Sequence, residues 1–194
     1  MADLITLARA QMVPSLASAD AAYLAELISA ASTMVIKYCN RDFNSTVYTE
    51  EEYDGEGTSV LLLNQFPIIT LTSVITVLDD GTEDTCLGAQ FRIDSDLGEI
   101  RPTPDCDCTY SWFLAGYRNI KVTYTAGYAT VPADVQEATA QEVAYLFANA
   151  STAANVDSWK LGDAAVAYNT TTAATQLLAP VVRQLLGPYR NVSI

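Results

Sequence analysis

The sequence predicts an α+β protein, with a helical bundle wall formed by N- and C-terminal helices and a central antiparallel β-rich unit. Apolar residues recur at helical spacing over residues 18–39, and from about residue 46 they alternate, as in strands with one buried face. Pro132 then marks the start of a second helical segment. With 194 residues, 50% of them hydrophobic, the chain can bury a core as one domain, or as one domain carrying an insertion.

The most strongly periodic helix is expected over residues 18–39, where the apolar positions are Leu24, Leu27, Ile28, Ala31, Val35 and Tyr38. Ser18 can cap this helix, and Asp20 lies in its first turn, where a carboxylate is favoured by the positive helix end. A shorter helix is expected before it, capped by Thr6 and ended before Pro14, because the residue preceding a proline avoids helical angles.

The middle of the chain is predicted to form short antiparallel strands. Six stretches are rich in β-branched and aromatic residues: VYTEEEY, TSVLLLN, TLTSVITV, AQFRID, LGEIRP and NIKVTYTA. Turn signals separate them at Asp54-Gly55, Asp80-Gly81 and Leu97-Gly98. The last strand is expected to end at Gly127.

Pro132 suits the first position of the helix that follows, since the missing N–H of proline has no helical partner there. This helix is expected to run to Phe147, and Glu142 lies on its inward, apolar face. A carboxylate at that place is paired in the core, faces a neighbouring subunit, or acts as a catalytic base, and no second titratable group is placed beside it.

The remaining segments are a small-residue stretch, a last helix and a tail. The last helix is expected at Pro180–Leu186, burying Val181, Val182, Leu185 and Leu186, and ending at Gly187-Pro188. The expected organisation is N-terminal helices at 1–45, a β-rich unit at 46–126, C-terminal helices at 127–187 with a mobile connector at 149–175, and an extended tail at 188–194.

Charge excludes several classes of function. The chain carries 10 basic and 23 acidic residues, a formal net charge of −13, and no histidine. A binder of the DNA backbone needs a basic patch, and histidine-dependent catalysis and most zinc or haem sites need histidine. No phosphate loop, nucleophile elbow or paired-carboxylate motif is found. We therefore expect no catalytic residue, cofactor or metal, and no membrane span or secretory signal.

Residues 46–130 hold most of the negative charge, with 14 acidic and four basic residues. The simplest interpretation of these acidic residues is that they lie in solvated loops and on strand edges, where charge prevents pairing with other sheets. The four cysteines, Cys39, Cys86, Cys106 and Cys108, are expected to be reduced thiols, with Cys39 as a small core residue. The spacing of Cys106 and Cys108 is too tight for a zinc knuckle.

Four phrases in this order resemble the head-tail connector proteins of tailed phages, also called adaptors or head-completion proteins. They are LITLARAQ, LAELISAASTMVIKYCNRDF, LLLNQFPIITLTSV and VTYTAGYATVPADVQEATAQEVAYL, and the resemblance covers most of residues 4–147. It implies a structural virion protein, assembled in the host cytoplasm, that forms a ring of twelve copies in the neck. Its partners would be the portal protein and a tail or stopper protein, with DNA passing through a channel and no specific DNA binding.

In such rings the C-terminal segment reaches the portal. Six residues are therefore candidates for the portal contact: Tyr189, Arg190, Asn191, Val192, Ser193 and Ile194. Their alternation suits a strand added to a portal edge, and a frayed terminus is the simpler interpretation. The alternatives are another neck or tail ring protein, such as a tail terminator or stopper, and a carboxylate-based glycan hydrolase, which needs two placed acids.

Overall fold

The computed structural model describes residues 3–105, 112–150, 158–161, 164–167 and 178–191. These residues form helices and antiparallel sheets, which confirms the α+β class. The contacts divide the chain into two compact units, one of residues 1–40 with 131–194 and one of residues 41–130. We refer to them as the helical unit and the sheet unit.

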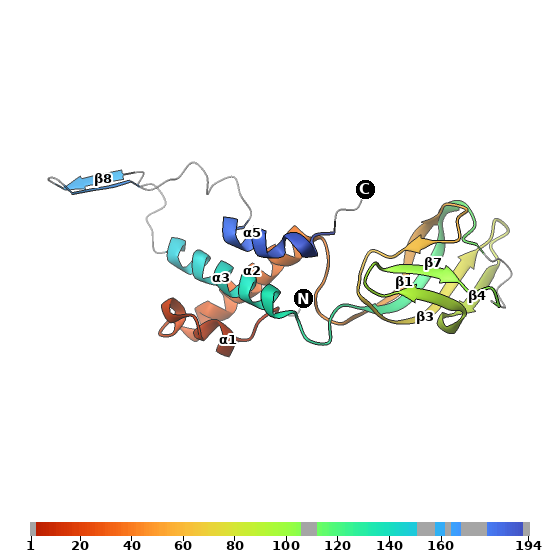
Figure 1. Cartoon of the computed structure of the whole chain (residues 1–194), viewed down its shortest axis with the longest axis horizontal. Helices are drawn as coiled ribbons and strands as arrows, with labels where there is room; N and C mark the ends of the chain where they lie inside the picture. The colour runs from red at the N-terminus through yellow and green to blue at the C-terminus, as the bar shows by residue number, and fades with distance from the viewer. Residues whose placement is uncertain (1–2, 106–111, 151–157, 162–163, 168–177, 192–194) are drawn as a thin grey trace. The chain divides into compact units, whose positions relative to one another are not determined.

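The helical unit contains α1, α2, α3 and α5; the first three share an apolar core, and α5 packs on α3 (Figure 1). Their bounds are Leu7–Gln11 for α1, Ala21–Cys39 for α2, Ala133–Ala150 for α3 and Pro180–Leu186 for α5, with single 3-10 turns at Pro14–Leu16 and Gly187–Tyr189. The N-terminal and C-terminal helices thus come together although the whole sheet unit separates them in sequence.

Helix boundaries differ from the expected ones in three places. Asp20, and not Ser18, caps α2, because its carboxylate accepts a hydrogen bond from the backbone N–H of Tyr23 at 3.0 Å. Pro132 precedes α3, and its carbonyl accepts the bond from the N–H of Gln136 that opens the helix. Helix α3 continues past Phe147 to Ala150.

The sheet unit is built from three-stranded and four-stranded antiparallel sheets. The strands are β1 at Thr46–Gly55, β2 at Leu61–Leu62, β3 at Ile68–Val77, β4 at Glu83–Leu87, β5 at Phe91–Asp94, β6 at Glu99–Pro102 and β7 at Gly116–Ala126, with a 3-10 turn at Gly88–Gln90. The orders are β1-β7-β3-β4 and β2-β6-β5. Strand β4 is the one that alternation in the sequence did not indicate.

The core of the sheet unit is continuous across both sheets. It includes Leu63, Val74, Phe91, Ile100, Phe113, Ile120, Val122 and Tyr124. Cys86 on β4 lies in the same core and is disulfide-bonded, so the expectation of a reduced thiol is wrong at this position. Cys106 and Cys108 lie outside the described residues, and Cys39 is a buried thiol of α2.

Gly127 allows the chain to leave β7. Its φ is +110°, which side chains rarely adopt, and a Cβ at this position would lie 2.2 Å from the carbonyl oxygen of Asn44. The N–H of Tyr128 then donates to the carbonyl of Phe43 at 3.0 Å, which ties the end of β7 to the segment before β1. Glycine is therefore required where the sequence predicted the strand to end.

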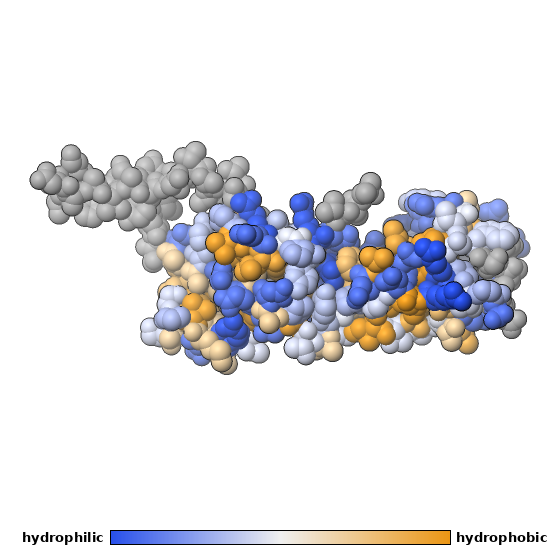
Figure 2. Space-filling model, in the orientation of Figure 1, coloured by the Kyte–Doolittle hydropathy of each residue, from blue (hydrophilic) through white to orange (hydrophobic). Residues whose placement is uncertain are grey.

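The expected connector at 149–175 lies largely outside the described residues. Its described part is a two-stranded hairpin, with β8 at Ser158–Leu161 and β9 at Ala164–Ala167. The hydropathy view shows apolar residues interleaved with hydrophilic ones over the visible faces of both units (Figure 2).

Candidate functional site

The C-terminal helix α5 is anchored by the one carboxylate that the sequence placed on an apolar helix face. Glu142 on α3 is 1% exposed, and its Oε2 accepts a hydrogen bond from the backbone N–H of Ala179 at 3.0 Å. Ala179 is the residue that caps α5, so Glu142 satisfies a backbone donor at the start of this short helix. Burial raises the pKa of the Glu142 carboxyl, and the bond from Ala179 opposes the rise.

The buried residues of α5 differ from the expected set at two positions. Val182 and Leu186 are buried, as expected, but Leu185 is half-buried and Val181 is 57% exposed. A helix of seven residues presents only one narrow face to its neighbours, and adjacent positions point about 100° apart. Val181 therefore lies on the outer side while Val182 packs inward.

Residues after α5 remain attached to the helical unit. The chain makes a 3-10 turn at Gly187–Tyr189, and the hydroxyl of Tyr189 donates to Asp134 Oδ2 at 2.7 Å. The N–H of Asn191 donates to the carbonyl of Cys39 at the end of α2, at 2.8 Å. The expectation that the chain is extended from Pro188 onward is wrong for Pro188 and Tyr189.

Arg190 lies between these two contacts. Its guanidinium carbon is 5.5 Å from the centre of the Tyr38 ring, which is the geometry of a cation–π contact. The structure thus places Tyr189, Arg190 and Asn191 against three partners on α2 and α3. Val192, Ser193 and Ile194, the rest of the proposed portal contact, lie outside the described residues.

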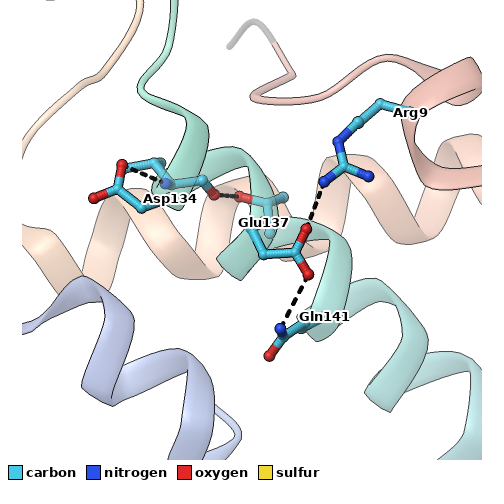
Figure 3. Close-up of polar contacts among 6 residues, drawn as sticks. Arg9, Asp134, Glu137 and Gln141 are labelled. Carbon is cyan, nitrogen blue, oxygen red and sulfur yellow. Dashed lines mark hydrogen bonds and ion pairs between the residues drawn. The ribbon is translucent and has the colours of Figure 1, made fainter. Parts of the chain in front are cut away.

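A second polar cluster joins α1 to α3. Figure 3 shows Glu137 of α3 between Arg9 of α1 and Gln141, with Asp134 one turn earlier on the same helix. Arg9 Nη2 forms an ion pair with Glu137 Oε2, and Gln141 Nε2 donates to Glu137 Oε1 at 3.0 Å. The bond from Gln141, together with the guanidinium of Arg9, lowers the pKa of Glu137. The cluster is an inter-helix clamp, and sequence spacing alone did not indicate it.

In the sheet unit, one residue of the acidic cluster at 50–56 is turned inward. Strand β1 has a bulge between Tyr48 and Glu51, where Glu50 adopts a φ of +51°. Because of the extra residue, Tyr48, Glu51 and Tyr53 all face the core. The expectation of solvated charges is therefore wrong for Glu51, which the structure makes part of an internal network.

Glu51 Oε2 accepts hydrogen bonds from the hydroxyls of Tyr124 at 2.6 Å and Tyr53 at 2.7 Å. The side chain of Asn64 donates to Glu51 Oε1, and the N–H of Asn64 donates to the Tyr53 hydroxyl, both at 3.0 Å. Burial raises the pKa of both tyrosines, so both hydroxyls remain donors at neutral pH. This network satisfies buried polar groups and provides no open position for a substrate.

Within the described part of the chain, no group of three or more Cys, Asp or Glu side chains could hold a metal ion. Nor does any helix among the described residues have the length and apolar character needed to cross a bilayer. The polar features of the described residues are thus the Glu142 contact, the Arg9–Glu137 cluster, the Glu51 network and the contacts of residues 189–191.

The family model for head completion protein matches residues 3–192, and the chain belongs to this family. The resemblance inferred from the sequence is thereby confirmed, as is a structural role in the head–tail connection. No curated protein matches the sequence, and the family match gives no support to a glycan hydrolase.

Solved structures share the fold. One chain from the neck of an empty gene transfer agent (GTA) particle, computed with C6 symmetry, has 17% identity and a TM-score of 0.63 over 98% of this chain and 91% of that chain. Another, from the neck of a native GTA particle computed with C12 symmetry, has 16% identity and a TM-score of 0.59, over 100% and 96%. A third, from the virion of a native GTA particle, has 17% identity and a TM-score of 0.54, over 98% and 91%.

Proposed function

We propose that the chain forms a ring of twelve copies in the neck of a tailed particle, between the portal and the tail, and completes the head after DNA is packaged. The observation that carries this proposal is the family match over residues 3–192. The chains with the same fold come from necks treated with sixfold and twelvefold symmetry, which supports a ring. The role is structural, and the protein needs no catalytic residue or cofactor for it.

The acidic balance suits a passage for DNA. A net charge of −13 repels phosphate, so a ring of such subunits lets DNA slide through without holding it. The same charge opposes close packing of the subunits. Self-association of the purified chain should therefore strengthen with salt, because the Debye length falls from about 10 Å at 0.1 M to about 3 Å at 1 M. Light scattering over a salt series measures this, and a ring already stable at low salt would contradict it.

We divide the C-terminal segment into a part that attaches it to the helical unit and a part that contacts the portal. Tyr189 and Asn191 fasten the segment to the helical unit through Asp134 and the carbonyl of Cys39. We assign to residues 192–194 the contact itself, as a strand added to an edge of the portal protein. The part that contacts the portal therefore begins after Asn191, and not at Pro188.

Two truncations test this division in particles and in the purified chain. Removing residues 192–194 should leave the thermal midpoint unchanged, while particles fail to retain the chain and lose DNA. Removing residues 188–194 should give the same particle defect and lower the midpoint by several degrees, since hydrogen bonds worth about 0.5–1.5 kcal/mol each are lost. Normal retention of both truncated chains would show that the portal contact lies elsewhere. Particles that keep their DNA and tail without the chain would overturn the proposed function itself.

A further inference from the structure

The end of the sheet unit farthest from its two chain connections holds a rigid loop. Strand β1 ends there at Gly55 and β7 begins there at Gly116, and these two residues are paired. Three residues of β7, 117–119, face the single residue Asp54 of β1 between two paired positions. A bulge of this kind turns side chains away from their regular positions.

This loop is tied at several atoms. Asn119 donates from Nδ2 to the carbonyl of Leu114 and accepts the N–H of Gly55 at Oδ1, both at 2.9 Å. The N–H of Arg118 donates to Asp54 Oδ1 at 2.7 Å, which holds Arg118 at a φ of +48°. A Cβ on Gly55 would lie 1.7 Å from the Leu114 carbonyl oxygen, so the backbones are in close contact. The sheet unit thus maintains a strained backbone at a place that holds no core residue.

The strained loop presents Tyr117 to solvent. Its side chain is 81% exposed, the highest value among the exposed large hydrophobic side chains. The Arg118 guanidinium lies 5.8 Å from the Tyr117 ring centre and 3.3 Å from Glu52 Oε2. Tyrosine and arginine are enriched among the residues that contribute most of the binding energy at protein interfaces. Tyr117 and Arg118 form a knob.

A cavity of about 400 Å³ lies beside the knob at the same end of the unit. Its apolar lining comes from Val77, Leu78, Leu114 and Ala115, and its polar lining comes from Asp79, Asp80 and Asn119. Asp80 accepts two hydrogen bonds from Thr82, which lower its pKa and keep it ionised, and Asp79 is exposed. The pocket therefore suits an aromatic ring accompanied by a cation.

Knob and pocket are two different patches at the same end of the sheet unit. Arg118 contacts Glu52 and Asp54 of β1. The pocket extends from Leu114, Ala115 and Asn119 to the end of β3 and the turn that leads to β4. A contact that joins two different patches of one chain repeats head to tail, and it forms a ring when the rotation between neighbouring copies closes.

We propose that Tyr117 and Arg118 of one copy insert into the pocket at Leu78, Asp79 and Asp80 of the next copy. This contact rests on the proposed ring and names its subunit interface. The phenol ring covers the apolar wall, and the guanidinium meets the two carboxylates. The carboxylates at Glu52, Asp54, Asp79 and Asp80 surround the knob and pocket on their own chain, so a nucleic acid phosphate is repelled from this surface.

The test uses the purified full chain and four variants with exposed side chains. Tyr117→Ala removes the knob and Asp79→Lys reverses the charge at the pocket. Leu97→Ala and Asp96→Lys are matched controls in the β5–β6 turn, where Ser95 bonds to Ile68 at the opposite end of β3. Sedimentation velocity over a concentration and salt series should show self-association about 30-fold weaker for Tyr117→Ala and Asp79→Lys than for the wild type. The two control variants should associate as strongly as the wild type.

An equimolar mixture of Tyr117→Ala and Asp79→Lys gives the decisive result. The first keeps its pocket and the second keeps its knob, so the mixture should form dimers and nothing larger. Unchanged association of either variant overturns the contact, and so does a Tyr117→Ala variant that forms dimers by itself as strongly as the mixture.

If the wild-type chain stays monomeric in solution, the contact is tested by measuring how many copies of each variant are incorporated per particle. Both variants should enter particles poorly while Leu97→Ala and Asp96→Lys enter normally. Equal incorporation of all four overturns the contact, and loss with only one of the two variants assigns the surface to a different protein. These outcomes leave the proposed function intact, because it fails only if particles without the chain are complete.

Discussion

The helical unit and the sheet unit place their inward-facing carboxylates in different surroundings, since Glu142 is buried and Glu51 is half-buried. Glu142 in the helical unit meets one backbone N–H at the start of α5. Glu51 in the sheet unit meets two tyrosine hydroxyls and an amide, and a bulge in β1 brings it there. Both units have an apolar core, but in the helical unit one polar contact is added to that core, whereas in the sheet unit a network of several hydrogen bonds and a backbone bulge accompany it.

The comparison teaches where each unit tolerates change. Helices satisfy the backbone groups of their interior turns, so substitutions at partly exposed polar side chains between them cost little. Strands with bulges and positive-φ residues depend on close backbone contacts that no side chain can replace. We therefore expect the largest losses of stability in the sheet unit and the smallest at the clamp between α1 and α3.

Gly127→Ala should have the largest effect, about 3 kcal/mol or more of unfolding free energy. The new Cβ would be 2.2 Å from the Asn44 carbonyl oxygen at a φ of +110°, so both a clash and backbone strain arise. Denaturant unfolding measures the loss. Gly81→Ala is the control, since its φ is +81° and no atom lies within 4 Å of its Cβ position. Equal losses for the two variants would show that the close contact at Gly127 does not matter.

Glu51→Ala should cost about 1–3 kcal/mol, because the buried hydroxyls of Tyr53 and Tyr124 lose their shared carboxylate acceptor. Glu56→Ala, an exposed acid of the same cluster, should change stability by less than about 0.5 kcal/mol. Thermal and denaturant unfolding of both variants measure the difference. If the two substitutions are equivalent, the internal network contributes nothing and the contrast between the units disappears.

Glu142→Ala should cost about 1–3 kcal/mol, since the N–H of Ala179 is left without its acceptor. Glu142→Gln retains an acceptor oxygen and removes the charge that burial disfavours, so it should equal or exceed the wild type at pH 7.

The same variant has a defined pH dependence. The folded-state pKa of Glu142 is raised above the unfolded value of about 4.3. Burying the ionised carboxylate therefore lowers the stability of the wild-type protein fully above the folded-state pKa, and not at all below the unfolded-state pKa. Any advantage of Glu142→Gln should shrink as the pH is lowered from 7 to 4. An advantage that grows toward acid would contradict a raised pKa.

Arg9→Ala should have the smallest effect, below about 1 kcal/mol, because the ion pair with Glu137 is partly exposed, with side-chain exposures of 31% and 44%. The lowered pKa of Glu137 means that its contribution is present above about pH 4.3 and is lost as the pH falls through the folded pKa. A double-mutant cycle of Arg9→Ala with Glu137→Ala at low and high salt measures the coupling. A coupling above 2 kcal/mol would make the helical unit as dependent on polar contacts as the sheet unit.

Several elements could be predicted from the sequence because they depend on local signals. The periodicity of α2, the strand β7 with its glycine end, and the bounds of α5 all follow from spacing and from Gly or Pro. The inward position of Glu142 also follows from helical spacing. Strand β4 and the docking of Tyr189 onto Asp134 could not be predicted, because their partners are distant in sequence and leave no local pattern.

By itself the sequence determined the α+β class, the acidic character and the absence of histidine, because composition and short-range periodicity need no knowledge of contacts. The order of its phrases also determined the family. Only the tertiary structure decided which carboxylate of VYTEEEY faces the core. A period of two assigns alternate residues to opposite faces, and the single extra residue at Glu50 shifts that assignment where β1 pairs with β7.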